Sequence, residues 1–201
     1  MRIPEDDKPR LEELDEQRRR IYDDFNLLVQ QIREGSVADT DPAVGENMMR
    51  INYFGTVYAT KAVLPGMIER HKGHIAMLAS IAGRIGAPLE AAYSASKFAV
   101  VGWSEAMAME LKPKGIGVSI INPGPVETEF FEARGHPYAR STPKPVTAER
   151  VAGDVIAAVE KNKLETYVPR WLGTAVISRV MIPPLYRAGT TRAFKQELGA
   201  K

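Results

Sequence analysis

The feature that most constrains the fold is a pair of short apolar runs on either side of one long stretch of helix formers. The first run covers residues 74–79, between Gly73 and Ser80, and the second covers residues 116–121. Short continuous apolar runs with such boundaries are typical of strands buried on both faces, as in parallel sheets. The stretch from 91 to 111 is long enough to be the helix that connects two parallel strands. The sequence therefore predicts an α/β fold with a parallel sheet.

Three residues with complementary chemistry follow the first predicted strand. Ser80 stands at its carboxyl end, and Tyr93 and Lys97 lie one turn apart on one face of the following helix. A cation one turn away favours the phenolate and lowers the tyrosine pKa from about 10, so Tyr93 can exchange a proton near neutral pH. The Ser80 hydroxyl, which both donates and accepts, could hold a substrate oxygen about 3 Å from the phenol. The trio suits proton transfer to or from an alcohol or ketone, although a Tyr-x-x-x-Lys pair alone is weak evidence, because chance supplies such pairs.

Four motifs, in this order and spacing, resemble those of the short-chain dehydrogenase/reductase family. They are Asn52 within RINYFGTV, Ser80, the run YSASK from Tyr93 to Lys97, and the run NPGPVET from Asn122 to Thr128. The resemblance covers about residues 40–170 and implies a Rossmann-type parallel sheet with flanking helices. It also implies hydride transfer between a nicotinamide cofactor, NAD or NADP, and the carbon of an alcohol or ketone.

The resemblance implies a role for each matching residue. Tyr93 would be the general acid/base, Lys97 would tune it and bind the ribose, Ser80 would hold the substrate oxygen, and Asn52 would hold a water of a proton relay. The residues around the nicotinamide would be Pro123, Gly124, Val126 and Thr128, with Thr128 bonding the carboxamide. Without the family, Asn52 is a buried asparagine that satisfies a backbone group, and Thr128 is the N-cap of a short helix over 129–134.

The first 35 residues depart from the family pattern. Residues 1–8 are polar and predict a flexible tail. Residues 9–35 carry apolar side chains at alternating three- and four-residue steps, which predicts one amphipathic helix. We favour packing of this helix on its own domain over a coiled-coil contact with a partner chain, because fewer than four heptads are present. A degenerate family strand around residues 26–31 is the less favoured alternative. Residues 36–201 would then form a partial Rossmann-fold catalytic domain.

The sequence contains no Thr-Gly-x-x-x-Gly-x-Gly turn, the family element whose backbone amides hold the cofactor pyrophosphate. We therefore expect an N-terminally truncated relative that binds NAD or NADP weakly and turns over slowly or not at all. The residue that selects NAD or NADP belongs to the same missing half, so the preference is not predicted. Two alternatives stay open: a cofactor-deficient relative that acts as a dimerising or regulatory protein, and the truncated product of a longer reading frame.

The helices around the predicted site suggest a homo-oligomer. Asp41 and Pro42 predict the start of a helix that carries Asn52 and runs towards Arg70. The helix over 91–111 has an outward stripe of small and apolar residues, which predicts a symmetric interface: Ala99, Gly102, Trp103 and Ala106.

The carboxyl-terminal third combines loops, one helix and an apolar, basic segment. Residues 135–146 are rich in proline and predict a mobile loop, which in the family covers the substrate. A helix is predicted from Thr147 to about Asn162, followed by a strand over 166–168. Beyond Pro169 the chain forms a helix packed on the core, a wall for a lipophilic substrate, or an interfacial membrane helix; the first is favoured and membrane association is not.

Composition excludes several other classes. The net charge is only +2 and its distribution is uneven, which does not imply a nucleic-acid partner. The sequence has no cysteine, and His71, His74 and His136 show no ligand spacing, so neither a disulfide nor a metal site is expected. It also has no apolar run of membrane-spanning length and no signal-peptide pattern, and we expect a cytoplasmic protein.

Overall fold

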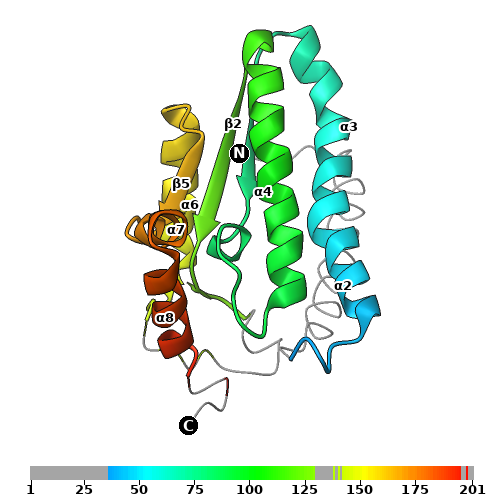
Figure 1. Ribbon diagram of the computed structural model, residues 1–201. Helices are drawn as coiled ribbons and strands as arrows, with labels where there is room; N and C mark the ends of the chain where they lie inside the picture. The colour runs from blue at the N-terminus through cyan, green and yellow to red at the C-terminus, as the bar shows by residue number, and fades with distance from the viewer. Residues whose placement is uncertain (1–35, 130–137, 139, 141, 196–197, 199–201) are drawn as a thin grey trace, which may run out of the picture.

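The computed structural model describes residues 36–129, 138, 140, 142–195 and 198, and it shows a parallel sheet between layers of helices (Figure 1). The sheet has the order β1-β2-β5, with β1 at Gly73–Leu78, β2 at Ile116–Pro123 and β5 at Glu165–Val168. Leu78 pairs with Ile121, and Pro123 pairs with Val168, so the three carboxyl ends share one edge of the sheet. The predicted α/β fold with a Rossmann-type parallel sheet and flanking helices is confirmed. The predicted tail 1–8, the helix 9–35 and all of the short helix 129–134 except Glu129 lie outside the described residues.

The connection from β1 to β2 follows the prediction. After the 3₁₀ turn η3 (Ile81–Gly83), α4 runs from Ala91 to Leu111 and ends in the 3₁₀ turn η4 (Lys112–Lys114). Gly115 then turns the chain into β2 with φ 75°, and a Cβ there would lie 2.5 Å from the carbonyl oxygen of His71. Only glycine meets both conditions, which explains why the helix stops there.

Helices cover the two faces of the sheet unequally. One face packs against α4 and α3 (Thr56–Glu69), the other against α6 (Ala148–Glu160), as Figure 1 shows. The first core contains Ile75, Met77, Met107, Leu111, Ile116 and Val118, and the second contains Ile121, Val151, Ala158 and Val168. The central strand β2 is therefore buried on both faces, as predicted. The same prediction for the first strand is wrong: Ala76 and Leu78 are exposed, Leu78 by 58%, because α6 lies mainly against β2 and β5.

The predicted helix around Asn52 is present but is not uniformly α-helical. It comprises α2 (Pro42–Met48), the π-helical segment η2 (Met49–Gly55) and α3. Asp41 caps it as predicted, with Oδ1 accepting a hydrogen bond of 2.8 Å from the backbone nitrogen of Ala43. The π-helical turn, which carries Asn52, was not predicted from the sequence, and such turns often occur at functional sites.

The last third of the described chain contains three helices and a small second sheet. The Thr147 hydroxyl caps α6 by accepting a hydrogen bond of 3.3 Å from the backbone nitrogen of Arg150. Two short strands that the sequence did not predict, β3 (Val126–Glu127) and β4 (Val146–Thr147), pair in parallel just before α6. After β5 come α7 (Leu172–Met181) and α8 (Pro183–Ala193). None of the helices in the described ranges has the length and apolar character needed to cross a membrane.

Candidate active site

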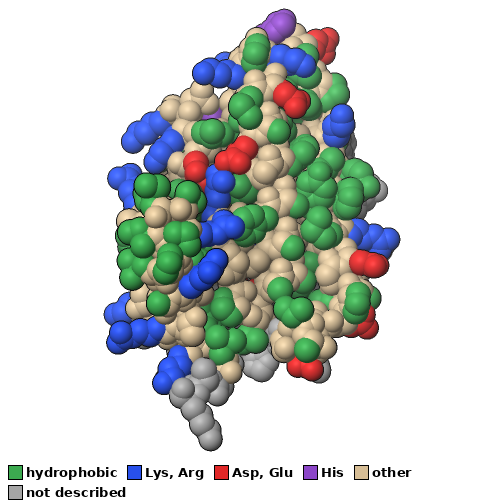
Figure 2. Space-filling view, in the orientation of Figure 1, with side chains coloured by type: hydrophobic (Ala, Val, Ile, Leu, Met, Phe, Trp, Pro, Cys, Tyr) green, Lys and Arg blue, Asp and Glu red, His purple; other side chains and the backbone are tan. Residues whose placement is uncertain are grey.

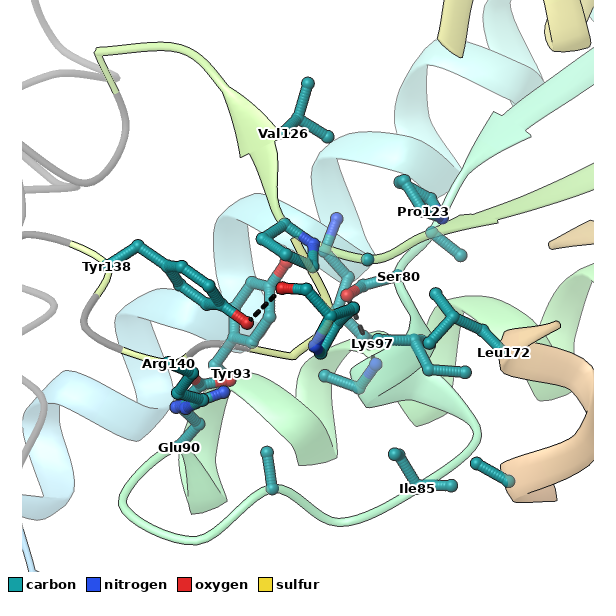
Figure 3. A pocket seen from close by; sticks show the side chains of 18 of the residues that line it. Ser80, Ile85, Glu90, Tyr93, Lys97, Pro123, Val126, Tyr138, Arg140 and Leu172 are labelled. Atoms are coloured by element: carbon teal, nitrogen blue, oxygen red, sulfur yellow. Dashed lines mark hydrogen bonds and ion pairs between the residues drawn. The ribbon is translucent and has the colours of Figure 1, made fainter. Parts of the chain in front are cut away.

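A cavity of about 1000 Å³ opens where the carboxyl ends of the three strands meet (Figure 3). This is the edge at which open parallel α/β sheets bind their ligands. The chain segments that leave the strands supply much of its wall, with Ser80 after β1, Gly124 after β2 and Leu172 after β5. All eight site residues predicted from the sequence line it: Asn52, Ser80, Tyr93, Lys97, Pro123, Gly124, Val126 and Thr128.

Ser80 is buried at the start of the 3₁₀ turn η3. Its Oγ accepts a hydrogen bond of 3.2 Å from the backbone nitrogen of Ala82, which fixes the hydroxyl at the cavity wall. Gly83 lies so close to α4 that a Cβ there would stand 2.7 Å from the carbonyl oxygen of Lys97. The turn that carries the serine is therefore packed directly on the helical turn that carries the lysine.

Tyr93 and Lys97 lie one turn apart on α4 and both reach the cavity. The Lys97 Nζ is 5.7 Å from the centroid of the Tyr93 ring and donates a hydrogen bond of 3.3 Å to the carbonyl oxygen of Leu78. Burial disfavours the charged ammonium and lowers the pKa of Lys97 to about 8. The ammonium group beside the phenol therefore releases its proton at a lower pH than a lysine in water does.

Asn52 is joined to the tyrosine turn by a short chain of hydrogen bonds. Its Nδ2 donates to the Ser96 Oγ over 3.0 Å, and that hydroxyl donates to the Tyr93 carbonyl oxygen over 2.8 Å. The carbonyl oxygen of Asn52 itself accepts from the Thr56 hydroxyl at 2.7 Å. Ser96 is fully buried, so its hydroxyl needs these partners. The π-helical segment and α4 are thereby held together at the turn that carries Tyr93.

The turn after β2 is held between β5 and α7. The Gly124 backbone nitrogen donates to the Val168 carbonyl oxygen over 2.8 Å, and a Cβ at Gly124 would lie 2.9 Å from the Leu172 Cδ1. Val126 continues into β3, where it pairs with Val146. This turn brings Pro123, Gly124, Val126 and Thr128 to the same side of the cavity wall.

A carboxylate network that the sequence did not reveal joins two of these segments. One oxygen of Glu165, at the start of β5, accepts from the Arg84 Nε at 2.6 Å, the Asn122 Nδ2 at 2.8 Å and the Tyr167 hydroxyl at 2.8 Å. Arg84 also pairs with Glu105 of α4 at 2.6 Å. Burial and the hydrogen bond to Glu165 raise the pKa of Tyr167 to about 12. Because Arg84 follows the serine turn and Asn122 precedes Pro123, this carboxylate positions both walls of the cavity.

A second pair missed from the sequence closes another part of the wall. Arg140 pairs with Glu90 at 3.2 Å, and its guanidinium lies 3.7 Å from the centroid of the Phe194 ring. The Tyr138 hydroxyl donates to the Pro143 carbonyl oxygen over 2.8 Å (Figure 3). Four residues of the segment 135–146 therefore line the cavity: Tyr138, Arg140, Thr142 and Pro143. Tyr138 and Arg140 lie on the opposite side from Leu172 in this view.

The profile of the short chain dehydrogenase family matches residues 12–139. The chain belongs to the short-chain dehydrogenase family. It is 37% identical over 171 residues to dehydrogenase/reductase SDR family member 7B of Rattus norvegicus, a match that covers 81% of the chain and 53% of that relative. It is 45% identical over 92 residues to 2-(S)-hydroxypropyl-CoM dehydrogenase 3 of Xanthobacter autotrophicus, covering 46% of the chain and 36% of that enzyme. The chain thus spans about half the length, or less, of these curated relatives.

Solved structures of the family share the fold. A short-chain dehydrogenase from Burkholderia cenocepacia, in complex with NADP, superposes with a TM-score of 0.68 and 28% identity, covering 79% of the chain and 64% of that structure. An enzyme from Sphingobium yanoikuyae, in complex with NADPH, has a TM-score of 0.63 at 19% identity and covers 84% of the chain and 61% of that structure. The family resemblance of the four motifs is confirmed, and the family match begins upstream of them, at residue 12.

The cavity fits one end of a nicotinamide cofactor better than the other. The residues expected at the nicotinamide and its ribose, among them Pro123, Gly124, Tyr93 and Lys97, all line the cavity. The glycines of the described cavity wall are Gly86, Gly124 and Gly189, and none of them stands at a strand-to-helix turn of the kind that cradles a pyrophosphate. Within the described ranges there is also no group of three or more metal-ligating side chains.

Proposed function

We propose that this chain carries the catalytic half of an oxidoreductase that moves a hydride between NAD or NADP and an alcohol or ketone. The observation that carries the proposal is the convergence of four separate segments, around residues 52, 80, 93–97 and 123–128, on one cavity. Membership of the short-chain dehydrogenase family and the NADP complex of a relative at 28% identity support it.

Each residue has a role that its position allows. The nicotinamide, when bound, supplies or accepts the hydride. The Tyr93 hydroxyl gives a proton to the substrate oxygen during reduction and takes it back during oxidation. The Ser80 hydroxyl holds the same oxygen, and Lys97 supplies a positive charge beside the phenol. Asn52 acts in part through Ser96, which fixes the backbone at Tyr93; the family's relay water would bind on the same helix.

The ligands follow from the wall of the cavity. Most of its lining is apolar, with Ile51, Ile81, Ile85 and Leu172 among the larger side chains, which suits a lipophilic alcohol or ketone. On the cofactor side, losing about 4 kcal/mol of phosphate and ribose contacts weakens binding about a thousandfold, from micromolar to millimolar. Residues 1–201 should therefore bind NADH and NADPH weakly, which calorimetric titration measures; a micromolar dissociation constant would contradict this.

The proposal is tested by Tyr93→Phe, which removes only the hydroxyl. We expect the rate of carbonyl reduction to fall at least about 10²-fold with the fold intact. The matched control is Tyr58→Phe on α3, because Tyr58 is 68% exposed and does not line the cavity. An active Tyr93→Phe protein with an unchanged pH profile would refute the assignment. A full chain that neither binds nucleotide nor turns over would instead favour the cofactor-deficient, dimerising relative.

A further inference from the structure

The outer surface of α7 and α8 carries an unusually exposed group of apolar side chains. Ile177, Val180 and Met181 recur at helical spacing on one face of α7, and Val180 and Met181 are 70% and 72% exposed. We call the α7–α8 patch the set Trp171, Ile177, Val180, Met181, Ile182 and Leu185, all exposed. Figure 2 shows hydrophobic side chains gathered over α7, with Lys and Arg side chains around them. Such a patch on a folded domain marks a surface that binds something.

The chain segment that carries the patch has charges of one sign only. Residues 166–195 contain no Asp or Glu and five cations: Arg170, Arg179, Arg187, Arg192 and Lys195. All five are exposed. Arg179 is held in place, because its guanidinium donates to the Arg84 carbonyl oxygen at 2.6 Å. The patch therefore combines exposed apolar side chains with a rim of these Arg and Lys residues, and residues 166–195 place no acidic side chain among them.

The same two helices also line the cavity with their other faces. Leu172, Ala175 and Ser178 of α7 and Tyr186 and Thr190 of α8 belong to its wall, which Trp171 and Leu185 of the patch also reach. Leu172 is buried there, so the favoured sequence expectation, a segment packed on the core, holds for this inner face. Packing on the core does not account for the exposed apolar side chains of the outer face, such as Val180 and Met181.

We propose that the α7–α8 patch docks the protein on a membrane surface that contains anionic lipids. Apolar side chains would enter the boundary between headgroups and acyl chains, while the Arg and Lys rim binds the headgroups. Charge complementarity selects this occupant, because a second copy of the patch would bring two positive rims together. Resting on the proposed function, docking also sets the substrate class: a lipid alcohol or ketone that reaches the cavity from the bilayer beside its α7–α8 wall.

Vesicle flotation of the full chain tests the docking. We expect it to float with phosphatidylcholine vesicles that contain phosphatidylserine, and much less with phosphatidylcholine alone. Binding should weaken at high salt, because screening shortens the reach of the charges from about 10 Å at 0.1 M to about 3 Å at 1 M. The double variant V180E/M181E should lose binding at least about tenfold, since two apolar groups no longer enter the interface. The matched control V63E, at a site 50% exposed on α3, should bind like the unchanged chain.

A second variant and a lipid-free measurement complete the test. The double variant R170E/R187E should lose the preference for vesicles with anionic lipid. If circular dichroism shows that V180E/M181E does not fold, R170E/R187E serves as the test variant in its place. Flotation that is absent, or equal for V180E/M181E and V63E, overturns the proposal. So does light scattering in which V180E/M181E dissociates an oligomer formed without lipid, because the patch would then bind a second copy. Tyr93→Phe should float normally, so loss of the proposed activity is distinguishable from loss of docking.

Discussion

Replacing Gly83 with alanine measures how tightly the serine turn is packed on α4. The new Cβ would lie 2.7 Å from the Lys97 carbonyl oxygen, 2.9 Å from the Lys97 carbonyl carbon and 3.0 Å from the Val101 Cγ2. Gly83 is buried, and two of these three atoms belong to the helix backbone, which cannot rotate away as a side chain can. Either η3 or α4 must therefore shift, and both carry residues of the site.

The cost follows from the packing. Forcing one extra carbon into a filled interior costs about 1–3 kcal/mol. For a domain of this size each kcal/mol lowers the melting temperature by about 2–4 °C, so Gly83→Ala should melt about 6 °C lower, at the centre of both ranges. A shift of the Ser80 hydroxyl relative to Tyr93 should also lower kcat/KM of any activity the chain has.

Gly86→Ala in the same loop is the control for a thermal melt followed by circular dichroism. A Cβ at Gly86 meets no atom within 4 Å. This variant should keep or slightly raise the melting temperature, because alanine restricts the unfolded chain by about 0.4–1 kcal/mol more than glycine. Equal melting temperatures for the two variants would show that the serine turn is not seated against α4 as described.

Three further predictions concern other parts of the chain. Lys97→Met should stabilise the protein at pH 7, because burial lowers the pKa of Lys97 to about 8 and so penalises its ammonium in the folded state. In urea melts the increase in unfolding free energy should shrink as the pH rises from 8 towards 10.5. An increase that does not depend on pH would contradict this. Glu165→Gln should destabilise by about 1–3 kcal/mol, since the partly buried Arg84 keeps only its pair with Glu105 and the carboxylate that also accepts from Asn122 and Tyr167 is lost. Asp154→Asn at the more exposed pair with Arg150 should cost clearly less, and equal losses in denaturant melts would argue against the network. Light scattering should show a dimer that Gly102→Glu dissociates, because Gly102 lies exposed on the outer face of α4, and a monomeric unchanged chain would exclude this interface.

The sequence predicted the parts of this structure that depend on local spacing. The four-residue step from Tyr93 to Lys97 puts both side chains on one face of a helix. The strand before Ser80 puts the serine at the carboxyl edge of a parallel sheet, where such sheets bind ligands, so the sequence could predict that the three residues line one cavity. Apolar periodicity does not tell which helix covers a strand, and for that reason the exposed side of β1 at Leu78 was predicted wrongly. The Glu165 network could not be predicted, because its partners Arg84 and Asn122 lie 81 and 43 residues away in the sequence.

The π-helical turn at Met49–Gly55 has a consequence for how this long helix tolerates change. Every residue of an α-helix advances the rotation about its axis by about 100°, so the wide turn resets the phase of α2 relative to α3. This allows Val44 and Met48 to face the cavity while Leu64 and Met67 face the sheet. Loss of a single residue within the turn would restore a regular helix of nearly the same length, yet it would rotate one half against the other. The helix thus consists of two α-helical segments, α2 and α3, whose side-chain faces are rotated relative to one another, and Asn52 lies in the π-helical turn between them.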